Sequence, residues 1–210
     1  DENPNRKFFS YANTVTTINF QKTFKGHGWV GLMFQAQPNQ EYSEIVLHVK
    51  FKENDATLQQ ETLGSLGVNL VYGAFYLYDN PRRLIKSLYD DISVDKIEID
   101  MVDFRGPAFE YVDNRLMSLQ LVKNSMTEAV VFNPEGKNML PADLLYKKDV
   151  FAVRGSFRPV TLVNVDMFEN GLEMFLKDTE GKPEDTVILF EITISNLKAS
   201  GNLDERDFLD

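Results

Sequence analysis

The sequence contains no cysteine among its 210 residues, and this absence removes several kinds of chemistry at once. A disulfide framework, a thiolate-bound metal and a cysteine nucleophile are all excluded. Basic residues are scarce too, because 22 Lys and Arg stand against 32 Asp and Glu, for a net charge of −10. A face that binds nucleic acid must neutralise phosphates with Lys and Arg. We therefore expect no nucleic-acid partner.

Long hydrophobic runs are also missing. The longest strongly apolar stretch, residues 66–78, is too short to span a bilayer. No charged leader followed by an apolar region opens the chain, so no signal peptide is expected. These patterns favour a cytoplasmic protein without a membrane partner. The chain begins without Met and ends in an acidic, helix-like segment, which we interpret as a piece of a longer protein whose remainder is a partner.

The composition is that of an ordinary globular protein, with 43% hydrophobic residues and 16 Phe to fill a core. Runs rich in β-branched and alternating apolar residues predict an antiparallel meander near the N-terminus, with strands at 14–24, 30–37 and 44–52. Helical spacing then predicts two helices, at 57–78 and 79–92. The second of these has Asn80 as its cap and Pro81 at its first position.

From residue 96 onward, predicted strands and helices alternate. The strands are expected at 96–104, 128–132, 149–153 and 186–194, and the helices at 106–126, 141–148 and 162–178. Such alternation is typical of a parallel sheet covered by helices. We therefore predict an α/β fold with a mostly parallel sheet flanked by helices. An N-terminal antiparallel β lobe, residues 1–55, would precede an α/β domain over residues 56–210.

The segment VFAVRGSFRPVTLVNVDMFENGL, residues 150–172, contains the candidate site. It reads as a strand, a turn and a helix, and ligands of open α/β sheets bind beyond the carboxyl ends of strands. Gly155 lets the backbone approach a ligand, and the N–H groups and dipole at the start of a helix favour an anion. Arg154 and Arg158 flank the turn and can reach phosphate oxygens, and Thr161 is a hydroxyl donor.

The residues of this turn, GSFRPVTLVN, resemble the G-x-F-x-P-x-T/H-x-G-H signature of the nucleotidylyltransferase superfamily, and they match it at Gly155, Phe157, Pro159 and Thr161. In that family the motif cradles the phosphates of ATP, so the resemblance implies ATP with Mg²⁺ as the ligand. Two positions depart from the family. Val163 replaces a glycine, and Asn164 replaces the second histidine, which stabilises the transferring phosphate. Because Asn cannot carry positive charge, we expect reduced or absent transfer.

A wider resemblance covers most of the chain. The segments PNRKFFSY, LQQETLGSLGVNL, VDNRLMSLQLVKN and GSFRPVTLVNVDM resemble a poorly characterised bacterial family that is often labelled nicotinate-nucleotide adenylyltransferase. This resemblance implies a nucleotide-binding domain. Two other interpretations of the same residues remain: a non-catalytic assembly or interaction domain of a longer protein, and an ordinary strand–turn–helix joint without a ligand.

Titratable residues outside this turn provide further candidates. The sequence has two histidines. His27 is either a ligand-stacking or metal-binding residue or an ordinary turn residue. His48 alternates away from the apolar face of its strand and is expected to be exposed or paired across the sheet. Glu98 and Asp100 share one strand face, with Asp103 near its end. They are interpreted either as Mg²⁺ ligands of a hydrolase or as a solvated face.

Overall fold

The computed structural model describes residues 3–157, 159–179 and 182–195. The chain forms two compact units, Asp1–Leu140 and Pro141–Asp210. Each unit is described below by itself. The division that the sequence predicts between residues 55 and 56 falls inside the first unit, between its third strand and its first helix.

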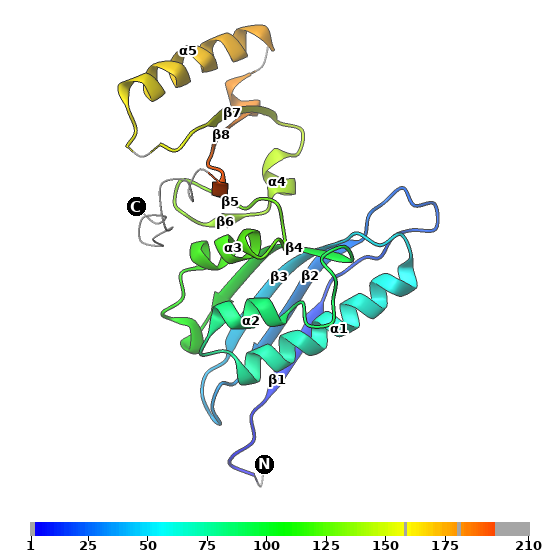
Figure 1. Cartoon of the computed structure of the whole chain (residues 1–210). Helices are drawn as coiled ribbons and strands as arrows, with labels where there is room; N and C mark the ends of the chain where they lie inside the picture. The colour runs from blue at the N-terminus through cyan, green and yellow to red at the C-terminus, as the bar shows by residue number, and fades with distance from the viewer. Residues whose placement is uncertain (1–2, 158, 180–181, 196–210) are drawn as a thin grey trace. The chain divides into compact units, whose positions relative to one another are not determined.

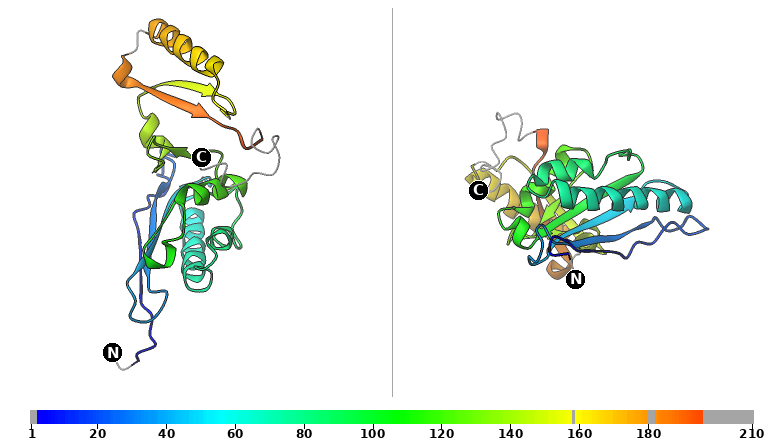
Figure 2. Two further views of the ribbon diagram at one scale, coloured as in Figure 1. Left: turned by 90° about the vertical axis from the view of Figure 1, so that its left-hand side faces the viewer. Right: turned by 90° about the horizontal axis from the view of Figure 1, so that it is seen from below.

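The first unit is built on a four-stranded sheet with the strand order β1-β2-β3-β4, in which every neighbouring pair is antiparallel. Helices α1, α2 and α3 lie on one face of this sheet (Figures 1 and 2). A small hairpin, β5–β6, completes the unit. The elements in chain order are β1 (Phe9–Asn13), β2 (His27–Phe34), β3 (Ser43–Phe51), α1 (Ala56–Tyr76), α2 (Pro81–Ser87), β4 (Ile97–Arg105), the 3-10 helix η1 (Pro107–Phe109), α3 (Asn114–Lys123), β5 (Val131–Phe132) and β6 (Asn138–Met139).

The core of the first unit lies between the sheet and its helices. Alternate residues of the strands point to this side, since successive side chains of a strand face opposite ways. Each large aliphatic side chain that leaves water here stabilises the fold by roughly 1.5–3 kcal/mol. Fully buried members of this core include Val30, Phe34, Ile45, Leu47, Ile97 and Ile99 from the strands and Leu66, Leu70, Leu84 and Ile85 from the helices.

Local sequence signals account for the helix starts. Asp55 caps α1, because its side chain accepts hydrogen bonds from the N–H groups of Thr57 and Leu58 at 2.9 and 3.0 Å. Asn80 caps α2 and Pro81 occupies its first turn, which confirms the predicted start of this helix, although it ends at Ser87 rather than at residue 92.

The predicted mostly parallel sheet is wrong. The main sheet is antiparallel, and the N-terminal strands belong to it together with β4 rather than forming an added lobe. The reason is the number of helices between strands. A single helix carries the chain back so that the next strand enters parallel, whereas α1 and α2 together return it in the opposite direction. Within the described residues, parallel pairing is confined to β7 and β8.

Several predicted elements differ in extent. The strand expected at 14–24 is wrong, because β1 precedes this segment, which contributes a single bridge from Thr16 to His27. The helix expected at 106–126 is divided into η1 and the shorter α3. Asp113 begins α3 as its cap and accepts a hydrogen bond from the N–H of Arg115 at 2.9 Å.

The second unit is a strand–helix–strand arrangement in which α5 connects the two parallel strands β7 and β8. Helix α5 has the same limits as the predicted helix, and it lies along one face of the two strands (Figure 1). No helix in the described part of the chain has the length and apolar character needed to cross a membrane. The elements are α4 (Pro141–Leu145), β7 (Asp149–Arg154), α5 (Leu162–Asp178), the 3-10 helix η2 (Pro183–Asp185) and β8 (Thr186–Glu191).

Two glycines provide a matched test of this fold. Gly106 has a φ of +91°, and an added Cβ would lie 2.7 Å from the carbonyl oxygen of Tyr42. We expect Gly106→Ala to lower the free energy of unfolding by at least about 2 kcal/mol. An added Cβ at Gly64, in α1, meets nothing within 4 Å. Gly64→Ala should therefore raise stability by about 0.5–1 kcal/mol. Urea unfolding of both variants measures the difference, and equal stability of the two would contradict the turn described at Gly106.

Candidate functional site

The turn that joins β7 to α5 is the site predicted from the sequence, and the structure shows how its charged residues are engaged. Nη2 of Arg154 donates to both carboxylate oxygens of Glu191, at 2.8 and 3.0 Å. The N–H of Gly155 donates to the carbonyl oxygen of Glu191 at 3.1 Å. These contacts connect the turn to β8, and the positive charge of Arg154 is already paired.

Thr161 and Asn164 are engaged with each other at the start of α5. The N–H of Thr161 donates to Oδ1 of Asn164 at 2.9 Å, and the N–H of Asn164 donates to Oγ1 of Thr161 at 3.3 Å. This reciprocal pair is a capping box, which satisfies two N–H groups that the helix itself leaves without partners. Asn164, at the position of the motif's second histidine, therefore stabilises the helix start.

Phe157 explains the need for glycine in this turn. Its φ is +51°, and its ring packs edge-on against Phe190 with 5.3 Å between ring centroids. A Cβ added to Gly155 would lie 3.1 Å from the ring of Phe157. Gly155 thus makes room for an aromatic side chain of the turn itself. Arg158, the remaining predicted contact, lies outside the described residues.

Among the described residues, the first N–H groups of α5 have no hydrogen-bond partner. Leu162 and Val163 are the first two residues of α5, so neither N–H has a carbonyl one turn earlier within the helix. Both residues are exposed, and the helix dipole adds partial positive charge at this end. The turn can therefore offer backbone N–H groups to an anion.

A second candidate site lies on the face of the main sheet opposite the helices. The pairing of β3 with β4 shifts register between His48 and Val49, so that Asp100 is an extra residue on β4. Such a bulge directs a side chain away from the regular alternation and is often found beside active sites. Here the carboxyl of Asp100 faces His48 on the neighbouring strand.

Asp100 is the centre of a buried charge cluster. Asp100 is only 3% exposed and His48 only 2%. Their side chains are joined by a 2.6 Å hydrogen bond between Oδ1 and Nδ1, and Nζ of Lys50 lies 2.6 Å from the other carboxylate oxygen. Burial by itself would raise the pKa of Asp100. The hydrogen bond with His48 and the ammonium of Lys50 outweigh it and hold the pKa below its ordinary value.

The ionised state of Asp100 determines the tautomer of His48. A carboxylate can only accept, so Nδ1 of His48 is the donor of this bond. The hydrogen bond fixes the orientation of the imidazole, as carboxylates that bond to histidines do in functional sites. Aromatic residues pack around it: the ring of Trp29 lies 4.9 Å away and that of His27 lies 5.6 Å away, between centroids.

Glu98 and Asp100 of β4 share Lys50, whose Nζ lies 4.0 Å from Glu98 and 2.6 Å from Asp100, whereas their other partners differ. Glu98 accepts a hydrogen bond from Oγ1 of Thr127 at 2.8 Å, and Asp103 accepts one from Nε of Arg105 at 2.8 Å. In the part of the chain that the structure describes, no group of three His, Asp or Glu side chains is placed to hold a metal ion. The solvated-face interpretation is also wrong for Asp100, which is buried. His48 was expected to be either exposed or paired across the sheet, and the structure confirms the pairing.

Sequence reasoning missed Lys50 and Trp29, which complete this cluster. A signal for it exists in the sequence IEIDMVDF. Apolar residues alternate at Ile97 and Ile99 and resume at Val102, one position late. This break in the period of two marks the bulge at Asp100. The partners on β2 and β3 carry no comparable local signal, because they become neighbours only through strand pairing.

Comparison of the chain with protein-family models, with curated proteins and with solved structures finds no match.

The buried cluster leads to a pH-dependent prediction. Asp100→Asn removes the nearer of the two carboxylates beside Lys50 and leaves Glu98, 4.0 Å from its Nζ. We expect the free energy of unfolding to fall by about 1–3 kcal/mol at pH 7. Because the folded pKa of Asp100 is depressed, its contribution is complete above the unfolded value of about 4 and is lost as the pH falls through the folded value. Urea unfolding at pH 7 and at pH 3 should thus show a smaller difference in acid. Asp90→Asn, at an exposed position, is the control, and an equal effect of both substitutions would contradict the cluster.

Proposed function

We propose that the chain binds the phosphate groups of a nucleotide at the β7–α5 turn and does not transfer them. One observation carries this proposal: the turn leaves the carboxyl end of a parallel strand and leads into the N-terminus of a 17-residue helix. This arrangement directs backbone N–H groups and a helix dipole toward one point. The motif resemblance of residues 155–164 supports ATP with Mg²⁺ as the ligand class.

The positions of the side chains support binding without transfer. Asn164 is held by Thr161, and Arg154 is held by Glu191, so neither is positioned to stabilise a transferring phosphate. In this proposal the phosphate contacts come from the N–H groups of Leu162 and Val163 and from Arg158. A backbone site of this kind can hold a nucleotide, but it lacks the charged group that phosphoryl transfer requires at Asn164.

A substitution at the first helical position tests this site directly. Proline is tolerated there and removes one N–H without disturbing the helix. Thr161, with φ −106° and ψ 161°, already has the extended conformation that a residue before proline adopts. We expect ATP to raise the melting temperature of the wild-type chain by mass action. Leu162→Pro should weaken ATP binding by about tenfold, the value of one hydrogen bond to a charged group.

Leu162→Ala is the matched control, because it shortens the same side chain and keeps the N–H. Arg158→Ala should also weaken binding. The measurement is thermal unfolding against ATP, ADP and inorganic phosphate, with and without Mg²⁺. An unchanged melting temperature with every ligand, or equal binding by Leu162→Pro and Leu162→Ala, would rule out phosphate contacts at this turn.

A second candidate function, an interaction module of a longer protein, is favoured by a different observation. Among the described residues from 141 onward, no side chain is buried. Phe151 and Phe190 contact α5, so Val150, Ala152 and Leu189 face the opposite side of the two strands. A sheet of two strands needs further strands or a packed helix for stability, and α5 supplies a helix on one face only. A further strand from another polypeptide would complete it.

Hydrogen exchange distinguishes this second candidate. If the second unit needs a further strand, the amides of β7 and β8 should exchange by local opening much faster than those of β2, β3 and β4 in the same sample. The strands of the main sheet serve as the internal control. Equal protection of both sets of strands would show that the second unit is stable as it is, and it would remove the reason for proposing a completing segment.

A further inference from the structure

The outer edge of the main sheet is open along β1. The N–H of Gln35 donates to the carbonyl of Phe8 at 3.0 Å, and the N–H of Thr14 donates to the carbonyl of Trp29 at 2.9 Å. The even-numbered residues of this segment therefore bond to β2. Because the pattern alternates in an antiparallel pair, the odd-numbered residues direct their N–H and C=O groups away from β2. These residues are Phe9, Tyr11 and Asn13.

In the described residues no strand pairs with this edge of β1. An unpaired edge of this kind is a template for an additional strand. The edge is not blunted by proline or by charged residues, since β1 has the sequence FSYAN. It therefore retains the full set of donors and acceptors that strand addition requires.

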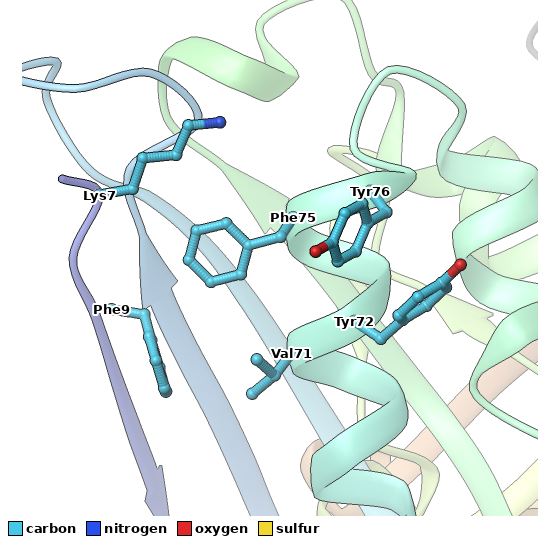
Figure 3. Close-up of a pocket in the computed structure, with 6 residues that line it drawn as sticks. All are labelled: Lys7, Phe9, Val71, Tyr72, Phe75 and Tyr76. Carbon is cyan, nitrogen blue, oxygen red and sulfur yellow. The ribbon is translucent and has the colours of Figure 1, made fainter. Parts of the chain in front are cut away.

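An aromatic groove runs beside the same edge. Figure 3 shows it between the start of β1 and the second half of α1, with Phe9 and Phe75 facing each other across it. Its volume is about 410 Å³. The residues that line it are Lys7, Phe9, Val71, Tyr72, Phe75 and Tyr76.

The rim of this groove exposes large apolar surfaces to water. Phe9 and Tyr72 are each 52% exposed, and Tyr76 is 70% exposed. The rings of Phe9 and Phe75 form an edge-on pair at 5.8 Å, and those of Tyr72 and Tyr76 lie 4.9 Å apart. Aromatic side chains gathered in this way are typical of protein-binding surfaces.

We propose that this edge and groove bind an extended peptide segment of a partner protein, which adds to the sheet antiparallel to β1. The odd-numbered residues of β1 supply the hydrogen bonds. Their side chains lie on the groove side, because Phe9 contacts Phe75. Side chains directly opposite them on an added strand lie on that same side. Apolar side chains at alternate positions of the peptide would thus enter the groove, as in other complexes formed by strand addition.

The charge at one end of the groove specifies the chemistry of the partner. Lys7 lines that end and has no acidic partner among the described residues. Although the chain as a whole carries a net charge of −10, the ammonium of Lys7 at this end of the groove favours a carboxylate on the incoming segment. In an antiparallel arrangement the C-terminal end of the peptide lies beside Lys7. The inferred occupant is an extended apolar segment with an acidic C-terminal end.

A second copy of the chain fits this surface less well. Strand β1 has five residues, which span about 17 Å. A stable dimer buries about 1,200–2,000 Å² in total, more than one strand pair of this length supplies. A short peptide needs no larger contact, because its side chains also fill the groove. This inference uses the first unit alone and does not depend on the phosphate site proposed for the β7–α5 turn.

The experiment uses the full chain and a heptapeptide of alternating threonine and valine that ends in glutamate, labelled with fluorescein at its N-terminus. Fluorescence polarisation measures its dissociation constant. We expect saturable binding by the wild-type chain and a loss of at least about fivefold with Lys7→Glu, since an attractive charge pair becomes repulsive. The same peptide ending in lysine should bind Lys7→Glu more tightly than it binds the wild-type chain.

Two methylated peptides test the backbone contacts without changing the protein. Methyl groups on the amides that face β1 should abolish binding, whereas methyl groups on the alternate amides should leave it unchanged. Equal binding of both peptides, or no binding of the unmodified peptide at about 1 mM, the weak end of the usual affinity scale, would overturn the proposal. A dimer in sedimentation that Phe9→Lys converts to monomer would also overturn it, because a second copy would then occupy the edge.

Discussion

The contact between one apolar face of the main sheet and helices α1 and α2 determines the rest of the first unit. Side chains such as Phe34, Leu47 and Leu70 are completely buried in it. Because strand side chains alternate, every residue between them is directed to the opposite face. The histidines and the charged residues of the strands are therefore collected on that opposite face. The same packing positions α1 beside the outer strand β1, where the aromatic groove forms (Figure 3).

One departure from this alternation, in β4, produces the charge cluster on the polar face of the sheet. The bulge in β4 adds Asp100 to the polar face, and pairing with His48 and Lys50 compensates its burial. A buried carboxylate is costly unless it is hydrogen-bonded and charge-paired. The cluster meets both conditions within three neighbouring strands, with Trp29 packed against the ring of His48. The bulge in β4 thus places a carboxylate within hydrogen-bonding distance of His48.

The second unit differs because it has no comparable core. Its helix α5 covers one side of two strands, and aromatic pairs such as Phe151 with Phe175 provide the packing between them. Polar groups of the β7–α5 turn bond to one another and to β8, which reduces what they can offer a ligand. Backbone N–H groups at the start of α5 remain, and this is why the proposed phosphate site rests on the backbone rather than on motif side chains.

The sequence by itself determined the local structure, including the limits of α5, the cap at Asn80 and the single helix between β7 and β8 that makes them parallel. These features depend on spacing and on neighbouring residues. The sequence also predicted two helices between β3 and β4, and these account for the antiparallel pairing of the two strands. The alternation of strands and helices beyond residue 96 nevertheless suggested a parallel sheet. Only the tertiary structure decided that Asp100 meets His48 and that Arg154 meets Glu191. Such partners lie tens of residues apart, and strand pairing alone brings them within hydrogen-bonding distance.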